Sequence, residues 1–276
     1  LENARYKNLD NAGKFKKEIF EFIDYRFNSI VLPFYDPKDI YGNKKSGYIE
    51  NYENKLIITF TSGKIIFLDK KKLLEDKILD YTEINNNIRD NFFDQKIKWT
   101  GVKDIKIVDK YLYISLTKKV KKNCYNTSLY KAALNKSNLN FIKVFEPDEC
   151  FDLNRNIQAF RYFNGHQTGG RIEHDNENIY LSLGDYNYWK EPQDFNSFAG
   201  KIIALKKSNN KITLISLGHR NPQGMLYLKE KNSLIITEHG PKGGDEINLI
   251  KLNDNKVRNY GWPISSYGNH YDVVPI

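Results

Sequence analysis

The sequence predicts an all-β protein built as a β-propeller with about four blades, and three observations support this prediction. The first is a recurring phrase, a short polar lead followed by a run of β-forming residues that ends near a Ser or Thr. It occurs as NKLIITF (54–60), KYLYISL (110–116), NIYLSLG (178–184) and NSLIITE (232–238). The hydroxyl residues Thr59, Ser115, Ser182 and Thr237 are 56, 67 and 55 residues apart. This spacing indicates a repeated supersecondary unit.

The second and third observations are the strand-like runs on either side of these phrases. All four phrases are followed by another such run, and three are also preceded by one. The following runs are 63–69, 128–134, 200–206 and 246–252, and the preceding runs are 102–108, 170–175 and 224–229. Three or four short strands per unit, separated by Gly, Asn and Asp, are typical of a four-stranded antiparallel sheet. Repeated sheets favour a propeller, whereas the alternative of a β-sandwich does not explain the shared phrase. Either the propeller has four blades or the chain is part of a larger one.

The first 45 residues contain no equivalent unit. The stretch KFKKEIFEFIDYRF (14–27) places apolar residues at helical spacing, which predicts a short amphipathic helix. The alternative is an irregular strand of an incomplete blade. We therefore divide the chain into an N-terminal segment (1–45) and a partial propeller domain (46–276).

The composition excludes several classes of protein. At 276 residues and 40% hydrophobic content, the chain is long enough to bury a sizeable core. Its net charge is +9, but the lysines are scattered without a sustained basic stripe, which argues against nucleic-acid binding. A diffuse positive field would attract a small anionic ligand. No run approaches the roughly 20 apolar residues of a membrane span. Met225 is the only methionine, so we do not expect Leu1 to be the natural start of the chain. The lack of a signal-peptide pattern at Leu1 therefore says nothing about compartment.

Cys124 and Cys150 are the only cysteines, too few for a zinc cluster and without CxxC spacing. They are either two buried thiols or one disulfide. Their strand-like runs belong to one blade, where adjacent antiparallel strands bring Cα atoms within reach of a bond. We therefore expect a disulfide, which is typical of an oxidising compartment.

Four polar loops are expected at one end of the propeller. In an antiparallel sheet, the loop that enters the first strand and the loop that leaves the second open at the same end. In the third unit these loops are GHQTG (165–169) and GDYNYW (184–189). In the fourth they are GHRNPQ (218–223) and EHGPKGGD (238–245). Their convergence predicts a pocket near the propeller axis.

The residue types in these loops suit catalysis. His166 and Asp185 form a candidate pair of general base and orienting carboxylate. Arg220 and Asn221 are donors suited to a developing oxyanion. The carbonyls of the GPKGGDE turn could face a cation, and Glu246 is the hard oxygen ligand that calcium prefers.

Each of these residues also has an ordinary structural interpretation. His166 could be a solvated loop residue, Arg220 could pair with Asp245, and Asp185 could cap a turn. Their joint position on one end of the propeller favours a site.

At these residues the chain resembles a known family. The motifs HQTGGRI, NIYLSLGD, GHRNPQG, TEHGPKGGDEINLI and NYGWP are similar to those of the soluble aldose sugar dehydrogenases that use pyrroloquinoline quinone (PQQ), the glucose/sorbosone dehydrogenase family. The resemblance runs from about residue 98 to the C-terminus and is strong from 164 onward. It implies a six-bladed propeller of which this chain holds about four blades. It also implies oxidation of an aldose sugar or related alcohol, with PQQ and calcium as cofactors, in the periplasm.

The resemblance also implies a role for individual residues. His166 matches the general base that takes the sugar hydroxyl proton, and Asp185 the carboxylate that orients it. Arg220 and Asn221 match residues that donate hydrogen bonds to the quinone oxygen. Gly240 and Pro241 match residues whose carbonyls bind the calcium ion beside the cofactor, and Glu246 and Tyr260 match ligands of a second calcium ion. Lys242 is a further cation for the PQQ carboxylates. The implied electron acceptor is a carrier such as a cytochrome or a quinone.

The sequence also departs from the family. In the family, further Lys and Arg residues that hold the PQQ carboxylates come from the last two of the six blades. We therefore expect this stretch to bind PQQ poorly. Gly165 stands where some members carry an acidic residue, and GDYNYWKEPQDF replaces the usual loop, so the sugar preference is open. The alternatives are a non-catalytic propeller that binds sugar or protein, and a calcium-dependent lactonase.

Overall fold

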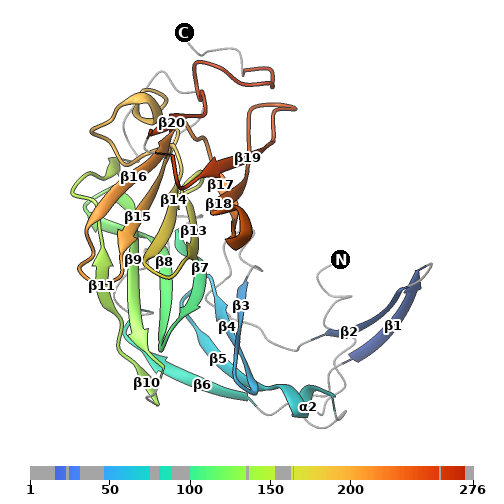
Figure 1. Cartoon of the computed structure of the whole chain (residues 1–276). Coiled ribbons are helices and arrows are strands. Elements are labelled where there is room, and N and C mark those ends of the chain that lie inside the picture. The colour runs from blue at the N-terminus through green and yellow to red at the C-terminus, as the bar shows by residue number, and fades with distance from the viewer. Residues whose placement is uncertain are drawn as a thin grey trace.

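The computed structural model describes residues 16–22, 25–31, 47–74, 81–88, 100–134, 137–152, 163, 165–254 and 256–270, the first two ranges by backbone alone. These residues form four sheets and one separate two-stranded ribbon (Figure 1). Helical structure among them is limited to one short α-helix and two 3-10 turns. The all-β prediction is therefore confirmed.

Each sheet has three or four main strands, and all of these neighbours pair antiparallel. The recurring phrase forms the second strand of each sheet, as the repeat predicts. The first sheet holds β3 (Gly47–Tyr52), β4 (Lys55–Phe60), β5 (Ile65–Asp69) and β6 (Tyr81–Asn86), with α2 (Lys70–Leu74) after β5. The second holds β7 (Gly101–Val108), β8 (Tyr111–Lys121), β9 (Cys124–Ala133) and β11 (Ile142–Phe145). The third holds β13 (Gly169–His174), β14 (Asn178–Leu183), β15 (Lys201–Lys206) and β16 (Ile212–Leu217), and the fourth β17 (Pro222–Leu228), β18 (Ser233–Glu238) and β19 (Glu246–Lys251).

Short strands from later in the chain cover the outer edges of two sheets. β10 (Asn138–Leu139) pairs in parallel with β6, and β20 (Arg258–Asn259) pairs in parallel with β16. The remaining short elements are β12 (Phe151–Asp152) beside β9 and the 3-10 turns η2 (Glu191–Gln193) and η3 (Lys229–Lys231). The segment that pairs with β6 lies between β9 and β11 of the second sheet, and the one that pairs with β16 follows β19 of the fourth. Each pair covers an edge that would otherwise be open to pairing.

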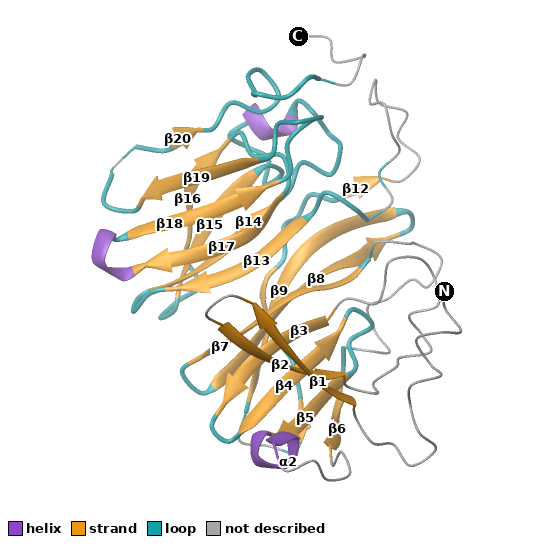
Figure 2. Ribbon diagram, turned by 90° about the vertical axis from the view of Figure 1, so that its right-hand side faces the viewer, coloured by secondary structure: helices purple, strands orange, loops and turns teal. Residues whose placement is uncertain are grey.

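The sheets follow one another in an arc, with the first strands β3, β7, β13 and β17 on the inner side in contact in chain order (Figures 1 and 2). Successive residues of a strand face opposite sides of its sheet, so one strand supplies two cores. Leu181 of β14 belongs to the core shared with the second sheet, whereas Tyr180 belongs to the core shared with the fourth. This is the packing of propeller blades, and the prediction of about four blades is confirmed.

Polar contacts also join the inner strands of neighbouring sheets. Arg171 of β13 pairs with Asp104 of β7 at 2.7 Å, and its Nε donates to the Gln223 carbonyl of β17 at 2.5 Å. The Asp104 carboxylate also accepts the Ile172 amide at 2.8 Å. These contacts hold the second, third and fourth sheets in the relative positions that the site loops require.

The expected N-terminal helix is wrong. Residues Lys16–Phe22 (β1) and Tyr25–Val31 (β2) form an antiparallel hairpin in which Phe20 lies opposite Phe27. Aromatic and β-branched residues favour strands, and pairing with β2 provides the backbone partners that a periodicity within one segment cannot reveal. Phe15 and Ile23, part of the helical pattern, lie outside the described residues. No helix in the described part of the chain is long and apolar enough to cross a membrane.

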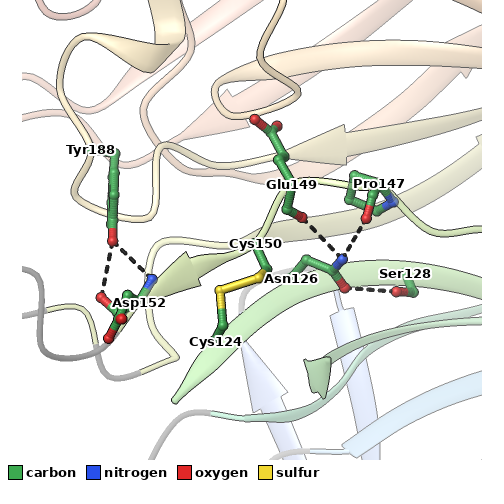
Figure 3. Close-up of a disulfide and its surroundings, with 8 residues drawn as sticks. All are labelled: Cys124, Asn126, Ser128, Pro147, Glu149, Cys150, Asp152 and Tyr188. Carbon is green, nitrogen blue, oxygen red and sulfur yellow. Dashed lines mark hydrogen bonds between the residues drawn. A yellow bond between two sulfur atoms is a disulfide. The ribbon is translucent and has the colours of Figure 1, made fainter. Parts of the chain in front are cut away.

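The disulfide prediction is confirmed. Cys124 begins β9 and Cys150 lies just before β12, and the antiparallel pairing of these strands places their Cα atoms 5.4 Å apart within a formed disulfide (Figure 3). The Asn126 side-chain amide supports the same segment by donating to the carbonyls of Pro147 at 2.9 Å and Glu149 at 3.2 Å. The disulfide therefore links the start of β9 to the segment that leads into β12.

Candidate active site

The four loops that the sequence predicts at one end of the molecule do meet there. The Asp185 amide donates to the Arg220 carbonyl at 2.8 Å, and the Tyr186 amide donates to the Gln167 carbonyl at 3.0 Å. The loop after β18 joins them because the His239 amide donates to the Asn221 carbonyl at 3.2 Å. Backbone hydrogen bonds thus hold all four loops together.

Asp185 is the buried centre of this cluster. Its side chain is fully buried, and its Oδ2 accepts the Trp262 indole N–H at 2.8 Å. Its Oδ1 accepts the Asn187 backbone amide at 2.9 Å, so the turn-capping interpretation is also correct. Burial raises the pKa of Asp185 to about 6, although the nearby Arg220 guanidinium opposes this shift.

The expected direct contact between His166 and Asp185 is not made. Asn187 lies between them: its side-chain Nδ2 is 2.8 Å from His166 Nε2, while its backbone N–H donates to Asp185. His166 is half-buried, so part of its side chain is exposed. The carboxylate orients the histidine only through this intermediate, which the sequence did not single out because Asn187 belongs to a loop that departs from the family pattern.

Gln167 completes the connection. In the orientation that satisfies its neighbours, its amide nitrogen donates to Asp185 Oδ1 at 2.7 Å and to Asn187 Oδ1 at 2.9 Å. Its amide oxygen accepts from the Arg220 guanidinium at 3.1 Å. One glutamine thus joins the histidine side of the site to the arginine side.

Arg220 does not pair with Asp245, the ordinary alternative for this residue. Its Nη1 donates to the carbonyls of His239 at 3.1 Å and Gly240 at 2.7 Å, and its guanidinium lies 5.2 Å from the Trp262 ring centroid. Asp245 instead accepts the Gly240 amide at 3.1 Å. Arg220 is therefore held between the two loops of the fourth sheet.

Asn221, the other predicted donor, is nearly buried. Its side-chain oxygen accepts the Gly169 amide at 3.2 Å, which fixes the start of β13 beside the His166 loop. The structure therefore brings His166, Asp185, Arg220 and Asn221 into one cluster.

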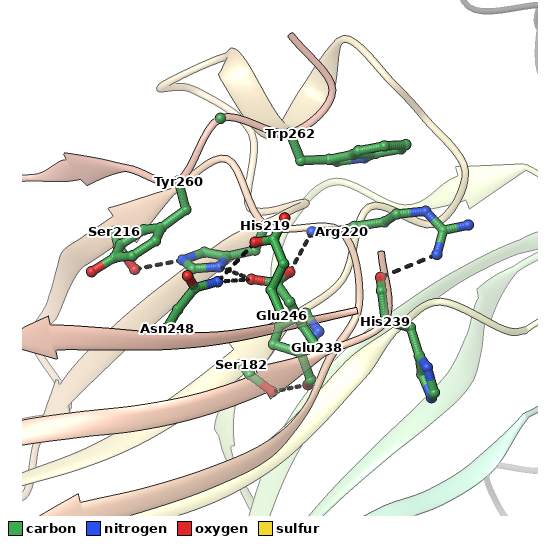
Figure 4. A network of polar contacts seen from close by, with 12 residues as sticks. Ser182, Ser216, His219, Arg220, Glu238, His239, Glu246, Asn248, Tyr260 and Trp262 are labelled. Carbon is green, nitrogen blue, oxygen red and sulfur yellow. Dashed lines mark hydrogen bonds and ion pairs between the residues drawn. The ribbon is translucent and has the colours of Figure 1, made fainter. Parts of the chain in front are cut away.

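A second polar network below Arg220 was not predicted as a unit (Figure 4). The fully buried His219 lies with its Nδ1 2.9 Å from Glu238 Oε1 and its Nε2 2.8 Å from Ser216 Oγ. Glu238 Oε2 accepts the Arg220 backbone amide at 2.8 Å. Burial raises the pKa of Glu238, but the charge and hydrogen bonds of His219 and its other partners outweigh burial and leave it below its usual value. This network positions Arg220, and the matching places of His166 and His219 before their strands were the one available sequence signal.

The GPKGGD turn offers backbone oxygen atoms to a calcium ion. Gly240 O accepts from Arg220, and Pro241 O accepts the Gly244 amide at 2.8 Å. A carbonyl has two lone pairs, so one hydrogen bond leaves room for a metal. The turn is tight, since a Cβ on Gly240 would lie 1.7 Å from the Gly244 oxygen. These carbonyl oxygens are ligands of the kind that calcium prefers. Lys242 is exposed on the same turn.

Glu246 and Tyr260, the candidate ligands of a second calcium, both adjoin the His219 network (Figure 4). Glu246 accepts from the Asn248 amide at 3.1 Å, and the Tyr260 ring stacks 4.9 Å from His219. The Tyr260 hydroxyl, however, donates to the Leu249 carbonyl at 2.7 Å. Across the described ranges, no three His, Cys, Asp or Glu side chains gather in a metal-binding cluster. A calcium ion here would therefore need backbone carbonyls in addition to the Glu246 carboxylate.

Comparison with known sequences agrees with these motifs. The family model described as Glucose / Sorbosone dehydrogenase matches residues 48–276. Aldose sugar dehydrogenase YliI of Escherichia coli (strain K12) is 36% identical over 126 residues, covering 41% of this chain and 33% of that protein. Quinoprotein glucose dehydrogenase B of Acinetobacter calcoaceticus is 30% identical over 128 residues, covering 36% of this chain and 26% of that protein.

Solved structures show the same fold. The apo form of the soluble aldose sugar dehydrogenase from Escherichia coli aligns with a TM-score of 0.61 at 22% identity, over 82% of this chain and 64% of that one. The PQQ-bound aldose sugar dehydrogenase from Streptomyces coelicolor aligns with a TM-score of 0.59 at 18% identity, over 92% of this chain and 68% of that one. The chain thus spans about two thirds of these structures, and about a third or less of the two sequence relatives is matched.

Proposed function

Since this chain belongs to the glucose/sorbosone dehydrogenase family, we propose that it takes part in the oxidation of aldose sugars or related alcohols with PQQ and calcium as cofactors. The observation that carries this proposal is the convergence of His166, Asp185, Arg220 and Asn221 on loops joined by hydrogen bonds. Bound PQQ would supply the hydride acceptor for the sugar. The protein side chains would bind the cofactor, orient the sugar and take the proton of its hydroxyl group.

His166 is the general base in this proposal. It is half-buried, so a sugar hydroxyl can reach it, and it is neutral when it accepts the hydroxyl proton. The buried Asp185 carboxylate accepts the Asn187 backbone N–H, and the Asn187 side-chain amide contacts His166, so Asp185 helps to position the base.

Arg220 and Asn221 supply the hydrogen-bond donors of the cofactor site. The Arg220 guanidinium is preorganised by Trp262 on one side and by the His239 and Gly240 carbonyls on another. Preorganised donors stabilise charge that develops on an oxygen because they need no rearrangement during the reaction. Lys242 adds a cation for a PQQ carboxylate, and the Gly240 and Pro241 carbonyls would hold calcium, with Glu246 and Tyr260 near the second ion.

The disulfide supports a location outside the cytoplasm, since such bonds persist in oxidising compartments. We therefore propose the periplasm, with a cytochrome or a quinone as the electron acceptor.

Replacing His166 with Gln tests this function. The change keeps a polar side chain of similar reach but removes the base, so turnover should fall by about 10² to 10⁴ with PQQ affinity nearly unchanged. The measurement is dye reduction with a panel of aldoses, after PQQ and calcium are added, together with a PQQ titration by fluorescence quenching. Unchanged turnover would remove His166 from the mechanism, and PQQ binding without turnover on any sugar would favour a binding module.

A further inference from the structure

We propose that Asn187 is a positioning residue that holds His166 as the neutral tautomer protonated on Nδ1, with its Nε2 lone pair occupied by the Asn187 amide until a substrate hydroxyl replaces it. The proposal rests on the proposed function of His166 as the base, and it assigns the base nitrogen and the residue that prepares it.

The orientation of the Asn187 amide follows from its neighbour. Gln167 donates one N–H to Asp185 Oδ1 at 2.7 Å and the other to Asn187 Oδ1 at 2.9 Å. Asn187 Oδ1 lies 2.9 Å from this Gln167 nitrogen and 2.8 Å from the Gln167 oxygen. We take the orientation in which Asn187 Oδ1 accepts from the nitrogen, which leaves Asn187 Nδ2 as the atom 2.8 Å from His166 Nε2. Both amides are set by the buried Asp185 carboxylate, which can only accept when it is ionised.

The orientation of the amide decides the tautomer of the histidine. An amide N–H donates, so His166 Nε2 must accept, and a neutral imidazole that accepts at Nε2 carries its proton on Nδ1. A protonated Nε2 would point its N–H at another N–H, so Asn187 disfavours the imidazolium and keeps the base ready. A sugar hydroxyl is also a donor, and it can take the place of the amide at the same lone pair.

The backbone places Asn187 in an uncommon conformation to make this contact. Tyr186 and Asn187 have φ values of 52° and 64°, in the left-handed region, where a non-glycine residue costs about 1 kcal/mol or more. The flanking tyrosines hold the segment in place: the Tyr186 hydroxyl accepts the Thr127 amide at 3.2 Å, and the Tyr188 hydroxyl accepts the Asp152 amide at 2.8 Å. Asparagine tolerates this conformation better than most residues and supplies the donor.

Two substitutions separate the amide from the backbone. Asn187→Gly removes the side chain but accepts the positive φ without strain. Asn187→Asp keeps the shape but replaces the donor with an acceptor, which requires a proton on His166 Nε2. Asn196→Ala, an exposed asparagine of the same loop, is the matched control.

The readout that needs neither cofactor nor turnover is the imidazole two-bond ¹H–¹⁵N correlation spectrum of protein labelled on histidine, with His166 assigned by its loss in the Gln variant. The unmodified protein and Asn196→Ala should both show the Nδ1–H form. Asn187→Gly should lose this preference, and Asn187→Asp should show the Nε2–H form or the imidazolium. An Nε2–H form in the unmodified protein, or a spectrum unchanged in Asn187→Gly, would overturn the proposal.

Kinetics supply the second readout. We expect kcat to fall about 10-fold in Asn187→Gly and about 10- to 100-fold in Asn187→Asp, the usual effect of removing a group that orients a histidine. The acid limb of kcat/KM should move to higher pH in both, because each change removes the donor that disfavours the imidazolium. Full activity in His166→Gln would end the proposed function while the tautomer result stood, so the two failures are distinguishable.

Discussion

At the scale of single residues, the site is organised around a carboxylate that the fold makes costly to ionise. Asp185 is fully buried, yet both of its oxygens accept hydrogen bonds and a guanidinium lies nearby. These partners only partly compensate for burial, which leaves its pKa at about 6. The site therefore retains a charge that a purely structural position would not need.

This shift predicts a pH dependence of stability. In the unfolded chain Asp185 ionises near the ordinary aspartate value of 3.8, whereas in the folded protein its pKa is about 6. The folded state binds the proton more tightly, so Asp185 contributes stability below about pH 4 that is lost as the pH rises toward 6 and beyond. Compared with Asp185→Asn, the unmodified protein should lose about 2 kcal/mol of unfolding free energy between pH 4.5 and 7.5.

The comparison isolates Asp185, because all other titrating groups are shared by the two proteins. Urea unfolding of both at the two pH values measures it, and any constant effect of the Asn substitution cancels in the difference. A stability gap that does not change with pH would contradict the raised pKa. The same variant should also have a lower turnover, by less than His166→Gln, because the carboxylate acts on the base only through Asn187.

The residue types of the site could be predicted from the sequence, but their contacts could not. His166, Asp185 and Arg220 lie in loops that antiparallel pairing brings together, which the repeat already indicates. The link through Asn187 depends on two successive left-handed residues, and no pattern in GDYNYW indicates them. The His219–Glu238 pair was missed for a related reason, since Glu238 ends a strand and only the folded register places it beside His219.

At the scale of secondary-structure elements, the disulfide joins β9 to the segment before β12 and so supports the site from outside. Asp152 of β12 is bound to the Tyr188 hydroxyl of the Asp185 loop by two hydrogen bonds, at 2.8 and 3.0 Å (Figure 3). The disulfide could be predicted from the sequence because the two cysteines belong to strand-like runs of one repeat. Strands of one repeat are neighbours in the sheet, so the repeat places the cysteines close together.

We predict that Cys124→Ser/Cys150→Ser lowers the unfolding free energy by about 3 to 4 kcal/mol, the loop-closure effect for a sequence separation of 26. The measurement is urea unfolding with and without dithiothreitol. The reductant should destabilise the unmodified protein by a similar amount and leave the double variant unchanged. Equal stability of the oxidised protein and the double variant would contradict this prediction.

The N-terminal hairpin shows where periodicity fails. The apolar residues of 14–27 fit a helical face, but strands β1 and β2 pair with each other over seven positions. A pattern within one segment cannot report a partner that lies beyond the next turn. The propeller strands were predicted correctly because four copies of the same phrase supplied that missing context.

At the scale of the whole molecule, the fourth sheet differs from the third. One face of it packs on the third sheet through Leu234 and Ile236. The other face exposes apolar side chains, with Leu226 54%, Ile247 78% and Leu249 45% exposed. In the third sheet both faces lie within cores, so the described arc is open at the fourth sheet. The hairpin β1–β2 pairs within itself and does not extend any of the four sheets.

The exposed face of the fourth sheet leads to our last prediction, that these 276 residues bind PQQ weakly. We expect a Kd above about 1 μM, which corresponds to less than about 8 kcal/mol of binding free energy. PQQ carries three carboxylates, and a carboxylate is bound tightly when a charged donor meets it in a desolvated pocket. Of the cations assigned to the cofactor, Arg220 already donates to the Gly240 carbonyl, and Lys242 is exposed to solvent. The loops that carry both residues adjoin the fourth sheet, which has the exposed apolar face. Fluorescence titration with PQQ in excess calcium measures the affinity, and Arg220→Ala should weaken it further, whereas Lys229→Ala in η3 should not. Nanomolar binding by this stretch would show that the four described sheets form a complete cofactor site.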